Sequence, residues 1–249
     1  MTAPAPPPLP DPETLRRRLE ELRARRGFLL AHHGAMAAAT PDLHEAYLQM
    51  YRALTVTPRH LSPLEKESVW LAVLVTTREA VGTHHLELFR QAGGSLEAAE
   101  RLLALAGHAA AQDTLAFAGR HWGDFLPGFD AQAAYARGIA ALRGDAVPEA
   151  TVELAMLAVQ AARHSAGGVA HHIRRGYALG LPEEHMVEAL SYLMWPCGVN
   201  AFLDACAVWH ELMLQGAVSP SPRFRVWAEA PAPEPYRRTG DGQGPGSFD

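Results

Sequence analysis

The chain has 249 residues, of which 48% are hydrophobic and 20% charged, with a net charge of −5 and an isoelectric point near 6.2. This length fits one large domain or two closely packed units, since domains usually contain about 100 to 200 residues. The slightly acidic balance gives no reason to propose nucleic acid or an anionic membrane as a partner. The charge balance therefore points to neither of these as a partner.

Both ends of the chain are poor in residues that can build a core. Residues 1–12 are dominated by proline and alanine, and residues 220–249 combine spaced prolines with a glycine-rich end. Such segments cannot bury enough apolar surface to fold alone, so we expect a disordered tail at each end and a folded body over 13–219. The basic residues between Arg16 and Arg26 alternate with Glu20 and Glu21, which indicates a solvated helix face.

The body has the apolar periodicity of helices almost throughout. A capping box with proline at the first helical position predicts a helix that starts at Pro63 and contains Glu67. Pro148 starts a matching helix, and further helices are marked by Ser95, Pro182 and the apolar stripe Phe202, Cys206, Trp209 and Met213. No segment alternates convincingly as a strand does, so the predicted fold class is all-α.

The pair His84-His85 recurs as His171-His172, and in each place a glycine follows eight residues after the second histidine. The matching helices upstream each carry a glutamate, Glu67 in the first copy and Glu153 in the second. Self-similarity at one period predicts repeated units that share a core. We therefore expect a tandem duplication, with an N-terminal repeat over 13–126 and a C-terminal repeat over 127–219.

The glutamate and the second histidine of each copy have a spacing that suits acid/base chemistry. His85 lies 18 residues after Glu67, and His172 lies 19 residues after Glu153. Two antiparallel helices at this spacing can bring the carboxylate and the imidazole together in a pocket, where the pair could relay a proton. We expect aromatic residues such as Trp70, Phe89, Tyr177 and Trp195 to supply pocket walls.

The chain resembles the carboxymuconolactone decarboxylase and alkylhydroperoxidase D superfamily in Leu61-Ser-Pro-Leu-Glu-Lys-Glu67, in His84-His-Leu-Glu-Leu-Phe-Arg-Gln-Ala-Gly93 and in residues 153–180. The resemblance extends over both copies, roughly residues 37–215. It implies an alkylhydroperoxidase D-like helical unit present twice and packed as one body. It also implies a homo-oligomer, a trimer or a dimer.

The chain departs from the redox members of that superfamily, which carry a C-x-x-C motif before the histidine. The corresponding positions are Arg78 and Val81 in the first copy and Ser165 and Gly168 in the second. Disulfide exchange needs a thiolate, so a dithiol peroxidase cycle is excluded at that site. The resemblance then implies the decarboxylase-like branch, a lyase that acts on a small organic acid or lactone without an organic cofactor or a metal.

The resemblance also implies roles for individual residues. His85 and His172 are expected to carry the proton, Glu67 and Glu153 to orient them, and His84 and His171 to assist or only to pack. Each histidine pair is expected to open its helix, with Thr83 as N-cap in the first copy, where the helix dipole favours neutral imidazole. Glu79 occupies a position at which cysteine-free relatives often have an acid, whereas its counterpart in the second copy is Ala166.

Three other interpretations remain open. Duplication preserves structural residues as faithfully as catalytic ones, so the histidines could belong to a binding or assembly module without chemistry. Four histidines could also bind a transition metal, although adjacent residues on a helix point about 100 degrees apart. Cys197 could be a lone peroxidatic thiol of a peroxidase-related antioxidant protein, while Cys206 on the apolar stripe is expected in the core.

The two cysteines are too few to indicate a disulfide framework. The N-terminus lacks the basic-then-apolar pattern of a secretion signal. The longest apolar stretch, around Val69 to Val75, is far shorter than the roughly 20 residues of a membrane-spanning helix. We therefore expect a soluble protein of the reducing cytoplasm.

Overall fold

The computed structural model describes residues 8–230, and every regular element in that range is a helix. The all-α prediction is therefore confirmed. The α-helices are α1 (Pro12–Arg26), α2 (Ala31–Ala39), α3 (Pro41–Tyr51), α4 (Pro63–Thr77), α5 (His84–Gln91), α6 (Leu96–His108), α7 (Ala111–Trp122), α8 (Ala131–Arg143), α9 (Glu149–Ala162), α10 (Ala166–Ala178), α11 (Glu183–Ser191), α12 (Val199–Leu214) and α13 (Pro222–Glu229). Shorter turns of π or 3-10 helix are η1 (Arg52–Val56), η2 (Ala80–Thr83), η3 (Gly123–Phe125) and η4 (Tyr192–Met194).

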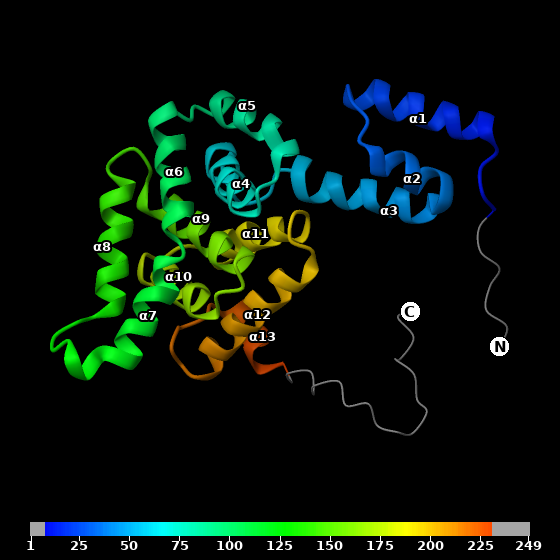
Figure 1. The fold of residues 1–249 in the computed structure, drawn as a ribbon. Helices are drawn as coiled ribbons and strands as arrows, with labels where there is room; N and C mark the ends of the chain where they lie inside the picture. The colour runs from blue at the N-terminus through cyan, green and yellow to red at the C-terminus, as the bar shows by residue number, and fades with distance from the viewer. Residues whose placement is uncertain (1–7, 231–249) are drawn as a thin grey trace.

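The core is organised around the packed pair α4 and α9, which lies in the middle of the molecule (Figure 1). Residues 151–161 of α9 are buried without interruption. A helix that is apolar on all sides is stable only when other helices surround it, and α9 packs on α4, α6, α10, α11 and α12. One continuous hydrophobic cluster therefore includes residues from both halves of the chain.

The predicted helix starts agree with the structure. Ser62 and Glu65 form a reciprocal capping box with Pro63 at the first position of α4. Ser95 accepts a hydrogen bond from the Ala98 amide at the start of α6, and α9 and α11 begin directly after Pro148 and Pro182. The Ser62 and Ser95 side chains satisfy amides that the first helical turn leaves unpaired, whereas α9 and α11 begin without a side-chain cap.

The first three helices form an N-terminal arm over residues 12–51, which extends away from the helices of the body (Figure 1). Inside the arm, Arg26 Nη1 lies 3.0 Å from His33 Nε2, and His33 Nδ1 lies 3.0 Å from His44 Nε2. Burial lowers the pKa of His33 to about 4, with smaller contributions from His32, Arg26 and His44. The arm thus has a polar centre of neutral imidazoles around one guanidinium.

Two expectations from the sequence need correction. The predicted flexible tail is wrong for residues 222–229, because they form α13 and place the aromatic rings of Phe224 and Trp227 against Trp209. The solvated face predicted for the basic cluster is wrong at Arg26, which is half-buried beneath Tyr51. Of the predicted tails, residues 1–7 and 231–249 lie outside the described range.

The two halves show the same order of elements around their glutamates and histidines. In each half a buried helix carries the glutamate (α4 and α9), the next helix carries the histidines (α5 and α10), and a left-handed glycine follows it (Gly93 and Gly180). The helix before the glutamate differs between the halves. In the C-terminal half α8 packs on α6 and α7, whereas in the N-terminal half α3 is part of the arm.

Candidate functional site

The first glutamate–histidine pair is formed between α4 and α5. His85 Nδ1 lies 2.6 Å from Glu67 Oε2, and both residues are 4% exposed. The indole of Trp70, one turn after Glu67, stacks on the His85 ring at 4.6 Å between centroids. The predicted convergence of these two groups is therefore confirmed in the N-terminal half.

This contact determines the tautomer of His85. A carboxylate only accepts hydrogen bonds, so the proton of a neutral His85 ring resides on Nδ1 and leaves a lone pair on Nε2. No described residue forms a hydrogen bond with that Nε2, and His85 lines a cavity. Lys66 Nζ lies 3.8 Å from the other oxygen of Glu67 and partly balances its charge. His85 thus has a basic Nε2 next to a cavity, while the Glu67 carboxylate binds its Nδ1.

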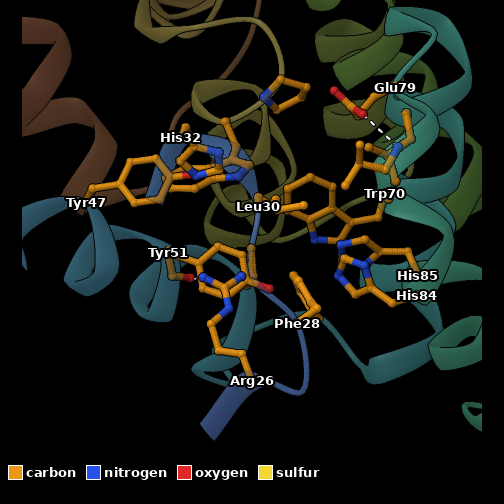
Figure 2. A pocket seen from close by; sticks show the side chains of 16 residues that line it. Arg26, Phe28, Leu30, His32, Tyr47, Tyr51, Trp70, Glu79, His84 and His85 are labelled. Carbon is orange, nitrogen blue, oxygen red and sulfur yellow. Dashed lines mark hydrogen bonds between the residues drawn. The ribbon is translucent and has the colours of Figure 1, made fainter. Parts of the chain in front are cut away.

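The cavity above His85, which we call the His85 cavity, has a volume of about 320 Å³. Its floor consists of α4 and α5 side chains, and its opposite wall comes from the N-terminal arm and from the segment after η4 (Figure 2). Tyr47 and Tyr51 of α3 lie against Trp195, with ring centroids 4.4 Å and 5.5 Å apart. The arm and the body therefore enclose the cavity together.

Polar groups of the cavity wall lack partners. The indole Nε1 of Trp70 and Nε2 of His32 are buried and form no hydrogen bond with any described residue, and both residues line the cavity. Burial lowers the pKa of His84, with a further contribution from the neighbouring His85. His84 is therefore predominantly neutral near neutral pH and lies beside the His85 ring, 4.2 Å away between centroids.

Glu79 also lines the His85 cavity but is committed to a local contact. Its Oε1 accepts a hydrogen bond of 2.8 Å from the Val81 amide and caps η2. The residue is exposed. The structure thus places Glu79 at the cavity without bringing it into the Glu67–His85 contact.

The second glutamate–histidine pair has the same Nδ1 contact as the first pair, but different residues surround it. His172 Nδ1 lies 2.6 Å from Glu153 Oε2, so the predicted convergence is confirmed here too. The other ring nitrogen of His172 lies 3.1 Å from the hydroxyl of Tyr135, which accepts a hydrogen bond from Gln160. His172 is 1% exposed and Tyr135 is fully buried. Both ring nitrogens of His172 are therefore occupied by protein groups.

His171 is tied to the protein as well. Its Nδ1 lies 2.6 Å from Gln132 Oε1, and burial lowers its pKa to about 4, with a smaller contribution from His172. The counterpart of Glu79 in this half, Ala166, is the first residue of α10. The second site thus consists of closed side-chain contacts and has no acid at that position.

The expected position of the histidines at a helix start is correct only in the first half. His84 is the first residue of α5, with Thr83 at the N-cap position but without a side-chain capping bond. In the second half α10 already begins at Ala166, because Ser165 accepts a hydrogen bond from the Gly168 amide and caps the helix there. His172 therefore lies in the second turn, beyond the strongest field of the helix terminus.

Cys197 and Cys206 are free thiols, and both are partly buried. Burial raises the pKa of Cys197, and it raises the pKa of Cys206 to about 11. A raised pKa reduces the thiolate fraction that peroxide chemistry requires. At the positions of the missing C-x-x-C motif, Arg78 ends α4 in a left-handed conformation and Ser165 caps α10.

Sequence reasoning missed the contribution of the arm to the first site and that of α8 to the second. Arg26, His32, Tyr47 and Tyr51 line the His85 cavity, yet they precede His85 by more than 30 residues and no period links them to it. Of the four aromatic residues expected in pocket walls, Trp70 and Trp195 line this cavity, Phe89 is buried in the core, and Tyr177 lies at a different surface hollow.

Two general features complete the description. Between residues 8 and 230, no helix is long and apolar enough to cross a membrane. The same range contains no group of three or more histidine, cysteine or acidic side chains arranged to hold a metal ion.

Comparison with known proteins identifies one part of the chain. Residues 128–211 match the model of the Carboxymuconolactone decarboxylase family, a segment that includes Glu153, His171 and His172. No curated protein and no solved structure matches the chain. The resemblance found in the sequence is thus confirmed for this segment, which excludes the first pair. The similarity to the Carboxymuconolactone decarboxylase family is thus found over residues 128–211.

Proposed function

We propose that the protein is an enzyme that performs general acid/base chemistry on a small organic acid or lactone, without an organic cofactor, at the Glu67–His85 pair. One observation carries the proposal. His85 Nδ1 is bound to a buried carboxylate at 2.6 Å, while its Nε2 has no described protein partner and the residue lines a cavity of about 320 Å³. A positioned imidazole of this kind contributes roughly 100- to 10,000-fold to a proton-transfer rate.

The same geometry suggests how a decarboxylation would proceed. As the bond to the carboxylate breaks, its electron pair moves into the conjugated carbonyl of the substrate and carbon dioxide leaves. A protonated His85 then donates its Nε2 proton to the carbon that lost the carboxylate. Glu67 stabilises the imidazolium before that transfer, because its negative charge lies against Nδ1. His84, neutral and adjacent, is placed to donate a hydrogen bond to a substrate oxygen.

We assign the Glu153–His172 pair a structural role. Its occupied ring nitrogens leave no atom for a substrate, and the network links α8, α9 and α10 inside the core. We interpret the two halves as copies of one ancestral unit, in which α8 covers the second histidine while α3 left the first one accessible. Homo-oligomer formation and a cytoplasmic location remain predictions. The peroxidase alternative loses support, because burial disfavours the Cys197 thiolate.

A hydrogen-exchange screen tests the proposal. The protein is incubated in heavy water with a panel of small carboxylated lactones and β-keto acids, and proton NMR follows both the loss of C–H signals and decarboxylation. We expect at least one compound to react, and His85→Asn to lower its rate by about 100-fold or more. The matched control His121→Asn, at an exposed histidine of α7, should keep the wild-type rate. An unreactive panel, or His85→Asn at full rate, would contradict the proposal.

A further inference from the structure

Five aromatic rings take part in the wall of the His85 cavity. Phe28, Tyr47, Tyr51, Trp70 and Trp195 all line it. They come from the arm, from α4 and from the segment after η4, so elements distant in sequence place ring faces and edges around one volume (Figure 2). Aromatic side chains bind planar rings favourably in offset-stacked or edge-to-face arrangements. The wall is therefore suited to a flat, unsaturated ligand.

The charge of the wall is positive at one end. Arg26 lines the cavity, and its guanidinium lies 4.3 Å from the centre of the Tyr51 ring. Only one of its five donors is bound to His33, at 3.0 Å. The carboxylate of the wall, Glu79, lies on the opposite side of the view from Arg26 and is bonded to the Val81 amide (Figure 2). The Arg26 end therefore favours an anion.

One unpaired donor indicates where a ligand acceptor is needed. Trp70 is 1% exposed, and its Nε1 has no hydrogen-bond partner among residues 8–230. An indole nitrogen can only donate, so the cavity lacks an acceptor at this point. Figure 2 shows this nitrogen on the side of the ring that faces His84 and His85. His32 Nε2, also unpaired and buried, belongs to the same wall.

The size of the cavity limits the ligand. Its volume of about 320 Å³ is at the small end of ligand pockets, which typically measure about 300 to 1,000 Å³. An apolar cavity of about 150 Å³ already holds benzene. One ring with a carboxylate and one or two small substituents would fill the His85 cavity, whereas a dinucleotide or a long acyl chain would not fit.

We propose that the His85 cavity binds a single-ring aromatic carboxylate, with its ring between the aromatic walls and its carboxylate at Arg26 and the unpaired Trp70 donor. The inference names a ligand class for the site of the proposed function and therefore rests on the same cavity. Its test measures binding alone and does not depend on turnover.

Calorimetric titration with three probes of similar size separates the contribution of the aromatic ring from that of the negative charge. Benzoate has the ring and the charge, cyclohexanecarboxylate has only the charge, and benzamide has only the ring. We expect benzoate to bind at least about tenfold more tightly than either of the others. No benzoate binding up to about 10 mM, or equal affinity for cyclohexanecarboxylate, overturns the proposal.

Matched variants locate the binding site. Trp70→Phe keeps the ring and removes the unpaired donor, so benzoate affinity should fall about fivefold or more. The control Trp209→Phe alters a buried tryptophan whose Nε1 bonds to Tyr177 and should leave the affinity unchanged. Arg26→Gln should abolish the preference for benzoate over benzamide, and Arg26→Lys, which retains the charge, should preserve it. Wild-type affinity in both Trp70→Phe and Arg26→Gln contradicts the assignment.

The outcomes for binding and for chemistry are distinguishable. Benzoate binding in a protein that exchanges no substrate proton would defeat the proposed function and leave the ligand class intact. Substrate exchange that depends on His85, in a protein that does not bind benzoate, would defeat the ligand class alone. His85→Asn should retain benzoate binding within a few-fold, because the ring walls and Arg26 remain.

Discussion

At the scale of residues, the same pair of side chains has two environments. Glu67–His85 and Glu153–His172 share a 2.6 Å contact through Nδ1. The difference lies at the other ring nitrogen, which is next to a cavity in the first pair and next to the Tyr135 hydroxyl in the second. The hydroxyl of Tyr135 on α8 thus accounts for the difference. It occupies the second ring nitrogen of His172, whereas His85 lies next to a cavity.

Tyr135→Phe tests the structural role of the second pair. The change removes the hydroxyl that contacts His172 and Gln160, so buried polar atoms lose a partner. We expect the free energy of unfolding to fall by about 1 to 3 kcal/mol, measured by urea denaturation. Tyr47→Phe is the matched control, because the Tyr47 hydroxyl forms no hydrogen bond within the described part of the chain. Equal stability of Tyr135→Phe and the wild type would contradict the role.

The pairs themselves could be predicted from the sequence, because a glutamate and a double histidine recur in register with a glycine. Their different accessibility could not. Tyr135 lies 37 residues before His172 on a helix that the pattern did not connect to it. The first cavity depends likewise on Arg26 and Tyr47, which share its wall with His85 although they lie far from it in the sequence.

At the scale of elements, the N-terminal arm is the part that distinguishes the first site. Its helices pack chiefly on one another, and η1 joins them to the body as a short π-helix. The loop between α1 and α2 supplies Phe28 and Leu30 to the cavity wall. The sequence predicted a solvated helix face for Arg16 to Arg26 at the start of the N-terminal repeat but not the polar centre of the arm, because arginine and histidines have none of the apolar periodicity that marks a core-facing helix.

The stability of the protein should depend on pH through His33 of this arm. In the unfolded chain the pKa of His33 is 6.5, and in the folded chain burial lowers it to about 4. Between these values the unfolded state binds a proton that the folded state does not, so stability falls as pH falls from 6.5 towards 4. Above that window His33 contributes no pH dependence.

Urea denaturation at about pH 7.5 and about pH 5 measures this effect. The wild type should lose about 1 to 2 kcal/mol more between the two pH values than His33→Asn does. His32 and His44 face His33 and also have pKa values lowered chiefly by burial, so part of the dependence persists in the variant. The exposed control His121→Asn should follow the wild type. Identical pH dependence in His33→Asn and the wild type would refute the assignment.

At the scale of the whole molecule, two helical halves share one core around α4 and α9. The family match covers residues 128–211, yet the accessible glutamate–histidine pair is in the other half. The two halves differ in what surrounds the pair. In the C-terminal half the pair belongs to a buried hydrogen-bond network, and in the N-terminal half it lies next to a cavity. The all-α class and the helix starts could be predicted from capping residues and apolar periodicity. The helix α13 could not be predicted, because the prolines around it indicated a tail rather than a helix with an aromatic face.

The central claim is that only the first pair performs chemistry, and isosteric replacement of each carboxylate tests it most directly. Glu67→Gln and Glu153→Gln are compared for the exchange rate of a reactive substrate in heavy water, with folding verified for both. We predict that Glu67→Gln lowers the rate by about tenfold or more, because the imidazolium of His85 loses its counter-charge. Glu153→Gln should stay within about twofold of the wild type. A large loss in Glu153→Gln with Glu67→Gln unaffected would contradict the account.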